Sequence, residues 1–177
     1  MRIFVVNGAP GCGKTTFEHY ARTYMLEHGY ICMIYSTIDF VKEIAHKCGW
    51  DGTKTPENRK FLSDLKKLLT DWDDVPFKKL EERLEDFEMT LVRYECSPAD
   101  GVAFIDCREP EEIKRICETF GAKSILVLGR EVDMEALNSN KSDKEVFNYD
   151  YDITIDNSGN LDDLIEEVKK FIEKDLA

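Results

Sequence analysis

The stretch Gly8-Ala9-Pro10-Gly11-Cys12-Gly13-Lys14-Thr15 decides the fold, because it fits the pattern G-x-x-x-x-G-K-[ST] completely. It follows an apolar run at residues 2–6, rich in β-branched side chains, which predicts a buried strand. It precedes a segment with one apolar face, which predicts a helix that ends at Gly29. A strand, a glycine-rich turn and a helix in this order predict an α/β fold with a phosphate-binding loop.

Such a loop, or P-loop, binds phosphate mainly through its backbone. Its glycines let successive N–H groups point at phosphate oxygens, and the helix N-terminus adds a partial positive charge. Lys14 would reach the β- and γ-phosphates, and the Thr15 hydroxyl would bind Mg²⁺. We therefore expect ATP and Mg²⁺ as cofactors, rather than a glycine-rich turn with a structural role only. The expected nucleotide-binding residues are Gly8, Ala9, Pro10, Gly11, Cys12, Gly13, Lys14, Thr15 and Thr16.

Strands and helices are expected to alternate along the chain. Short apolar runs predict strands at residues 2–6, 31–35, 102–106, 124–128 and 151–155. Helical periodicity lies between them, and alternation of this kind predicts a parallel sheet with right-handed crossovers. Two consecutive helices within residues 56–95 interrupt the pattern. We expect them to form an insertion on the carboxyl edge of the sheet, where ligands bind in such folds.

Two of the predicted helices carry marked apolar stripes. The helix that begins at Pro56 presents Phe61, Leu62, Leu65, Leu68 and Leu69. The next one places Phe77, Leu80, Leu84, Phe87 and Leu91 at alternating spacings of three and four, which predicts packing in the core or between helices. No internal repeat or linker divides the chain, so residues 1–177 are predicted to form a single domain.

Composition narrows the classes of function. The net charge of −12 and the lack of a basic stripe argue against a nucleic-acid partner. No run approaches the eighteen or so apolar residues that a membrane span needs, and residues 2–6 do not resemble a signal peptide. The six cysteines include no CxxC pair, which favours reduced thiols. We expect a cytoplasmic monomer or homodimer that binds a small phosphorylated molecule.

Asp106 and Arg108 follow the third predicted strand, at the edge where the P-loop also lies. A carboxylate at this place can hold Mg²⁺ or one of its waters, and the alternative is an Asp that caps a turn. Arg108 can bind a phosphate with two parallel hydrogen bonds, and the alternative is a solvated Arg before Pro110. Thr15 and Asp106 are therefore the predicted metal ligands.

Two other kinds of P-loop protein fit less well. An energy-coupled ATPase usually has a second carboxylate directly after the strand's Asp, and here that neighbour is Cys107. Residues 140–143 match the guanine-recognition motif N-K-x-D. However, residues 131–139 before them are mostly polar instead of forming a buried strand, and no DxxG follows the third strand.

Over essentially its whole length the chain resembles the P-loop nucleoside monophosphate kinase superfamily. It looks most like the deoxynucleoside-monophosphate-kinase-like proteins of phages and bacteria. The resemblance rests on the P-loop, on Ile105-Asp106-Cys107-Arg108-Glu109-Pro110, on residues 50–59, and on residues 138–143 with 151–157. It implies a five-stranded parallel sheet in the order 2-3-1-4-5, a helical acceptor-binding region at about 37–95, and a lid at about 130–148.

The resemblance also implies roles for single residues. Asp106 and Arg108 resemble the family's adjacent Asp-Arg motif, although Cys107 separates them here. The implied catalytic residues are Lys14, Asp106, Arg108 and Arg130. The implied acceptor-binding residues are Asp39, Lys54, Arg59 and Arg108, with Lys141 and Lys144 from the lid.

Three functions stay open from the sequence. The first is a kinase that transfers the terminal phosphate of ATP to a nucleoside monophosphate, including deoxynucleotides. The second is a small-metabolite kinase, because the D-x-R pattern is similar to that of animal-type phosphomevalonate kinases. The third is a non-catalytic ATP-binding regulator, for which the acidic helical stretch 71–95 would provide a partner surface.

Overall fold

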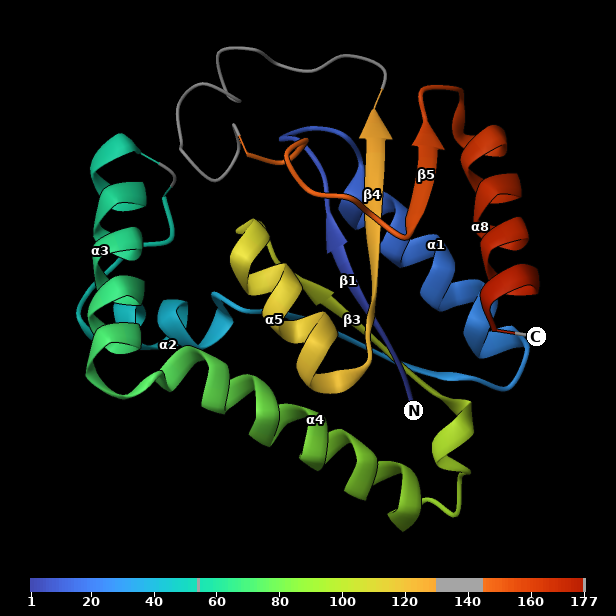
Figure 1. Ribbon diagram of the computed structural model, residues 1–177, viewed down its shortest axis with the longest axis horizontal. Coiled ribbons are helices and arrows are strands. Elements are labelled where there is room, and N and C mark those ends of the chain that lie inside the picture. The colour runs from blue at the N-terminus through green and yellow to red at the C-terminus, as the bar shows by residue number, and fades with distance from the viewer. Residues whose placement is uncertain (54, 130–144, 177) are drawn as a thin grey trace.

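A five-stranded parallel sheet in the order β2-β3-β1-β4-β5 forms the centre of the protein, as the family resemblance implied (Figure 1). The computed structural model describes residues 1–53, 55–129 and 145–176. The strands are β1 (Arg2–Asn7), β2 (Ile31–Ser36), β3 (Gly101–Asp106), β4 (Lys123–Gly129) and β5 (Ile153–Asn157). The helices are α1 (Lys14–Glu27), α2 (Asp39–Lys47), α3 (Pro56–Asp73), α4 (Val75–Arg93), α5 (Pro110–Phe120) and α8 (Leu161–Asp175), with a 3₁₀ turn, η1, at Pro98–Asp100.

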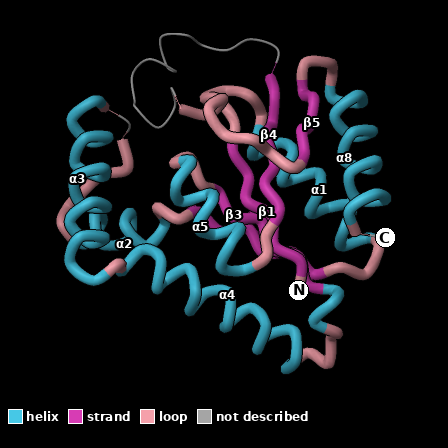
Figure 2. The backbone as a smooth tube through the Cα atoms, viewed as in Figure 1, coloured by secondary structure: helices cyan, strands magenta, loops and turns pink. Residues whose placement is uncertain are grey.

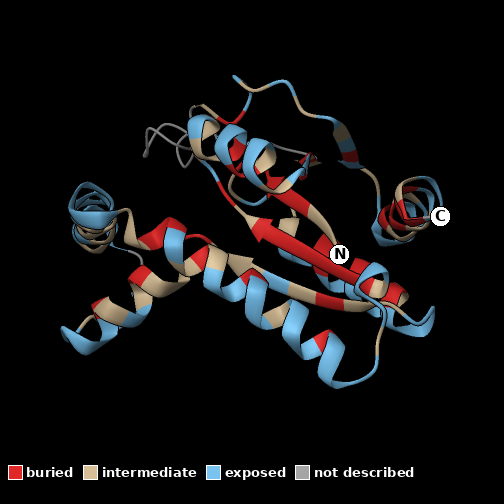
Figure 3. Ribbon diagram, turned by 60° about the horizontal axis from the view of Figure 1, so that its bottom comes forward, coloured by how far each residue is buried: buried red, intermediate tan, exposed pale blue. Residues whose placement is uncertain are grey.

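The sheet separates two apolar layers. Successive side chains of a strand point to opposite faces, so Phe4 and Val6 of β1 lie on one side and Val5 on the other. On the first side α1 and α8 cover the sheet, and Phe17 and Phe171 pack in the same cluster as Phe4. On the second side α5 and α4 cover it. Figure 2 shows the helices on the two sides of the sheet, and Figure 3 shows the buried residues on the strands and on the inward sides of the helices.

The predicted position of the second inserted helix, α4, is wrong. It packs against a face of the sheet instead of standing on the carboxyl edge, because Phe77, Leu80 and Leu84 join the core cluster of the second side. Phe77 also stacks on Phe120 of α5, with ring centroids 5.7 Å apart. The prediction that this stripe is packing surface is therefore confirmed.

The α3 helix has a different character, since none of its side chains is fully buried and Leu62, Leu65 and Leu69 are only half-buried. Phe61, Leu68 and Trp72 are 38%, 65% and 82% exposed. Its apolar stripe is consequently not part of the core, and a polar contact described below joins α3 to the carboxyl edge. None of the helices in the described ranges is both long and apolar enough to cross a membrane.

The last strand begins two residues later than predicted, at Ile153 instead of Tyr151. Side chains fix the two residues before it. The Asp152 carboxylate accepts hydrogen bonds from the Ser124 backbone N–H and hydroxyl, both at 2.7 Å. These bonds stand where ladder bonds between β4 and β5 would otherwise begin.

The contrast between α3 and α4 gives a stability prediction. Leu80→Ala removes a fully buried side chain from α4 and should lower the free energy of unfolding by about 2–5 kcal/mol. Leu68→Ala, a matched change at an exposed position of α3, should change it by less than about 0.5 kcal/mol. Urea unfolding measures both variants, and equal losses would contradict the described packing of α3.

Candidate functional site

The P-loop joins β1 to α1, in the strand-loop-helix context that the motif requires. Gly13 has a φ of 91°, in the left-handed region that favours glycine. A Cβ at Gly13 would lie 2.1 Å from the Asn157 amide nitrogen, which donates a hydrogen bond of 2.8 Å to the Cys12 carbonyl. Gly13, the second fixed glycine of the motif, is thus required for two reasons: its left-handed backbone conformation and the close approach of Asn157.

The loop also packs closely on β4. A Cβ at Gly129 would lie 2.6 Å from the Cys12 Cα, so the end of β4 can approach the loop only as glycine. The sequence analysis assigned no role to Gly129 or to Asn157. Only the three-dimensional register of β4 and β5 brings both against the P-loop.

Lys14 and Asp106, two predicted site residues, meet in an ion pair. The Lys14 Nζ lies 2.5 Å from the Asp106 Oδ1, and the two side chains are only 15% and 25% exposed. The pairing of Val6 with Asp106 in the parallel sheet places the end of β3 beside the start of the P-loop. The Asp106 carboxylate therefore lies beside the P-loop, where the sequence analysis expected a ligand of Mg²⁺.

Asn7 links the start of the P-loop to the residues that follow β3. It is fully buried, and its Oδ1 accepts a hydrogen bond of 2.8 Å from the Gly8 N–H. Its amide group donates to the Arg108 carbonyl at 3.3 Å and to the Tyr151 hydroxyl at 2.8 Å. Asn7 thus holds the backbone of Arg108 next to the P-loop, and the Arg108 side chain is exposed at the same edge.

Glu18 is an acidic residue that the sequence analysis overlooked. It is 3% exposed, and among the described residues its Oε1 has no hydrogen-bond partner. Burial, and after it the Asp106 carboxylate, raise the pKa of Glu18 to about 8, although Lys14 acts in the opposite direction. A signal was present in the sequence, because Glu18 falls among Phe17, Ala21 and Met25 on the apolar face of the predicted helix.

The raised pKa of Glu18 predicts how stability depends on pH. Between pH 4.5 and about 8 the unfolded chain ionises this carboxyl while the folded protein keeps its proton. Rising pH then favours unfolding. Glu18→Gln cannot titrate, so its stability relative to wild type should increase from pH 5 to pH 8, on the order of a few kcal/mol. Urea unfolding of both proteins between pH 5 and pH 8 tests this prediction. A stability difference between Glu18→Gln and wild type that does not change with pH would contradict it.

Lys66 of α3 forms a second cluster of charges at this edge. Its Nζ lies 2.7 Å from Glu112 and 3.0 Å from Glu109, two residues near the start of α5. The Cys107 thiol donates to Glu112 at 3.2 Å. Burial alone would lower the pKa of Lys66, but the two carboxylates outweigh it and raise the pKa. Cys107, Glu109 and Glu112 have ligand atoms within 4.8 Å of one another, and the Lys66 ammonium already binds both carboxylates.

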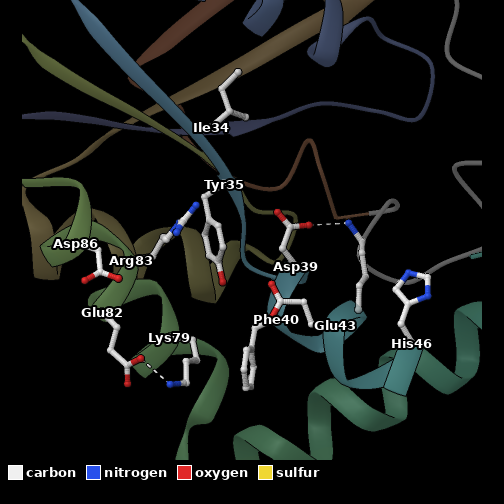
Figure 4. A pocket seen from close by; sticks show the side chains of 11 residues that line it. Ile34, Tyr35, Asp39, Phe40, Glu43, His46, Lys79, Glu82, Arg83 and Asp86 are labelled. Atoms are coloured by element: carbon white, nitrogen blue, oxygen red, sulfur yellow. Dashed lines mark hydrogen bonds and ion pairs between the residues drawn. The ribbon is translucent and has the colours of Figure 1, made fainter. Parts of the chain in front are cut away.

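Asp39 lines a cavity of about 500 Å³ between β2, α2 and α4 (Figure 4). Its carboxylate accepts hydrogen bonds from the Ser36 N–H and from Lys42, both at 2.9 Å. Tyr35 and Arg83 lie side by side in the same cavity. Arg59 is exposed on α3 and lines neither this cavity nor the one beside the P-loop. Asp39 and Arg59 as acceptor ligands therefore stay predictions.

Four predicted residues lie outside the described part of the chain: Lys54, Arg130, Lys141 and Lys144. The same holds for most of the predicted lid at 130–148, of which residues 145–148 are described. Their proposed contacts with phosphate stay predictions from the sequence.

A second cavity, of about 490 Å³, opens beside the P-loop. Thr16, predicted as a nucleotide contact, lines it together with Gly129, Asn157 and Asn160. It lies where the loop between β5 and α8 passes the start of α1. Side-chain amides and a hydroxyl thus surround a space directly next to the phosphate-binding loop.

No protein-family model matches the chain, and no curated protein sequence matches it. Among solved structures, it is similar to a mutant APS kinase from Mycobacterium tuberculosis, with 14% identity, a TM-score of 0.44, and 97% of this chain and 96% of that chain covered. It is also similar to shikimate kinase from Aquifex aeolicus, with 15% identity, a TM-score of 0.46, and coverages of 98% and 96%. Shikimate kinase from Bacteroides thetaiotaomicron shows 16% identity, a TM-score of 0.44, and coverages of 98% and 97%. These likenesses say nothing about the substrate of this chain.

Proposed function

We propose that this protein transfers the terminal phosphate of ATP, with Mg²⁺, to a nucleoside monophosphate. The observation that carries the proposal is the Lys14–Asp106 pair, 2.5 Å apart, at the junction of the P-loop and the end of β3. The residues present fit the nucleotide: Gly13 lets the loop backbone curl, and the N-terminus of α1 faces the loop. Thr15 and Asp106 offer the oxygen ligands that Mg²⁺ prefers.

The cavity beside the P-loop suits the donor's base and ribose. Gly11 and Cys12 of the loop line it, so a nucleotide whose phosphates lie in the loop could extend into it. The Asn157 Oδ1 can accept a hydrogen bond from a base edge and the Asn160 amide group can donate one, while the Asn157 amide group binds the Cys12 carbonyl and the Asn160 Oδ1 caps α8. This placement leaves the Arg108 side of the edge for the acceptor.

The chemistry of phosphoryl transfer asks little of the protein beyond alignment and charge neutralisation. On donor binding, Lys14 would exchange the Asp106 carboxylate for the β- and γ-phosphates. Asp106 would then hold the Mg²⁺ or one of its waters. Arg108, exposed at the same edge, would bind the acceptor phosphate. A single domain, a cytoplasmic location and a monomer or homodimer remain part of the proposal.

Lys14→Ala tests the donor site. It removes the only Lys of the loop, so phosphoryl transfer should fall by at least about 100-fold. The variant also leaves the Asp106 carboxylate without its ion-pair partner, so thermal unfolding is measured to establish that it is folded at the assay temperature. Lys170→Ala changes a 69% exposed Lys on α8 and serves as the matched control. A coupled assay over a panel of nucleoside and deoxynucleoside monophosphates measures transfer. Undiminished transfer by a folded Lys14→Ala variant would contradict the assignment.

The same panel separates the alternatives. Transfer to a non-nucleotide phosphate alone would favour the small-metabolite kinase. Binding of ATP without transfer to any acceptor would favour the regulator.

Arg108→Lys tests the acceptor site. The change keeps the positive charge but loses the paired hydrogen bonds of the guanidinium, so the acceptor KM should rise or kcat should fall about tenfold. Arg93→Lys, at the exposed end of α4, is the control. Steady-state kinetics with each substrate varied in turn give the answer. A loss of ATP affinity with unchanged acceptor kinetics would place Arg108 on the donor side.

A further inference from the structure

Glu18 lies on the side of α1 that faces the candidate metal ligands. It follows Lys14 by four residues and Thr15 by three, and both spacings bring side chains to the same side of a helix. Phe17, its neighbour, packs edge-on against Phe104 of β3, with ring centroids 5.9 Å apart. This turn of α1 therefore lies over the end of β3.

The strand supplies the facing carboxylate. Val102 and Phe104 of β3 point into the core layer under α1, and residues two apart share a face, so Asp106 points the same way. The Lys14–Asp106 ion pair confirms that α1 reaches Asp106. Two carboxyl groups, Asp106 and Glu18, thus face the same small region next to Thr15, and Lys14 is the cation found with them.

Burial of Glu18 demands an explanation. A carboxyl group taken out of water without a partner is costly, and buried polar atoms are almost always hydrogen-bonded. Among the described residues, Glu18 Oε1 has no such partner. A water or an ion bound at the site would supply the missing partner.

We propose that Glu18 is a positioning residue for the divalent cation of the nucleotide, accepting a hydrogen bond from one of the ion's waters beside Asp106. The proposal rests on the ATP- and Mg²⁺-binding part of the proposed function. It assigns a partner to an otherwise unsatisfied carboxyl, and it adds a third oxygen-bearing side chain to Thr15 and Asp106. Mg²⁺ usually keeps several of its waters, so an outer ligand of this kind suits its chemistry.

The charge balance of the donor site favours this role over a purely structural one. When Lys14 turns to the phosphates, Asp106 loses its partner while the polyphosphate brings further negative charge. A divalent cation next to Thr15 would compensate Asp106, and it would also stabilise the ionised form of Glu18. Glu18 would then hold a water of the ion only when the nucleotide arrives with its metal.

The test compares affinities for a fluorescent, non-hydrolysable ATP analogue with and without saturating Mg²⁺. The ratio of the two measures the coupling between metal and nucleotide, and it requires no turnover. Glu18→Gln keeps the size of the side chain and removes its charge, so the ratio should fall about 10- to 100-fold. Glu27→Gln, the same change at an exposed position of α1, should leave it unchanged.

Each outcome decides a separate point. An unchanged ratio in folded Glu18→Gln would overturn the inference. If that variant does not fold, a crystal structure of the wild-type protein with Mg²⁺ and the analogue takes its place: a water that bridges Glu18 and the ion supports the proposal, and a direct contact or none overturns it. Wild-type protein that shows the coupling but phosphorylates no acceptor would contradict phosphoryl transfer alone and leave the role of Glu18 standing.

Discussion

The ion pair between Lys14 and Asp106 sets the electrostatics on which the site depends. It forms because β1 and β3 are neighbours in a parallel sheet, so the loop after one strand meets the last residue of the other. The pair is mostly shielded from water, where an unpaired charge of either sign would be costly. Each group therefore stabilises the other until ligands of the opposite charge replace both. The glycines of the loop and the bonds of Asn7 and Asn157 serve to hold this geometry.

The helical region attaches to that edge in two ways. The α4 helix is held by apolar burial against the sheet, which is insensitive to what binds at the edge. The α3 helix has no fully buried side chain, and the Lys66 contacts with Glu109 and Glu112 join it to the start of α5. Those two carboxylates follow Arg108 closely in sequence. The α3 helix is thus joined by ion pairs to residues next to Arg108, whereas α4 is held chiefly by the core and also lines the cavity of Asp39.

The sequence predicted the parallel sheet and the meeting of the P-loop with Asp106 from strong local patterns, and the family resemblance implied the strand order. It failed where the outcome depended on tertiary packing. The stripes of α3 and α4 look alike in sequence, and only the sheet surface available to α4 separates a core helix from an exposed one. Glu18 was overlooked because a single acidic residue on the apolar face of a predicted helix does not by itself indicate a binding site. Asn157 and Gly129 could not be found, since their contacts join distant strands.

The acidic character of the chain bears on how the site would work. Lys14 and Lys66, both at the carboxyl edge, already hold carboxylates, so a phosphate that binds to either cation must displace an acidic side chain. The displaced carboxylate then needs a new cation, and for Asp106 the metal that accompanies ATP supplies it. Binding at this edge is thus an exchange of partners rather than the filling of an empty basic pocket. A nucleotide without its metal would leave Asp106 and Glu18 facing the polyphosphate, which makes selectivity for the metal complex a consequence of the resting ion pairs.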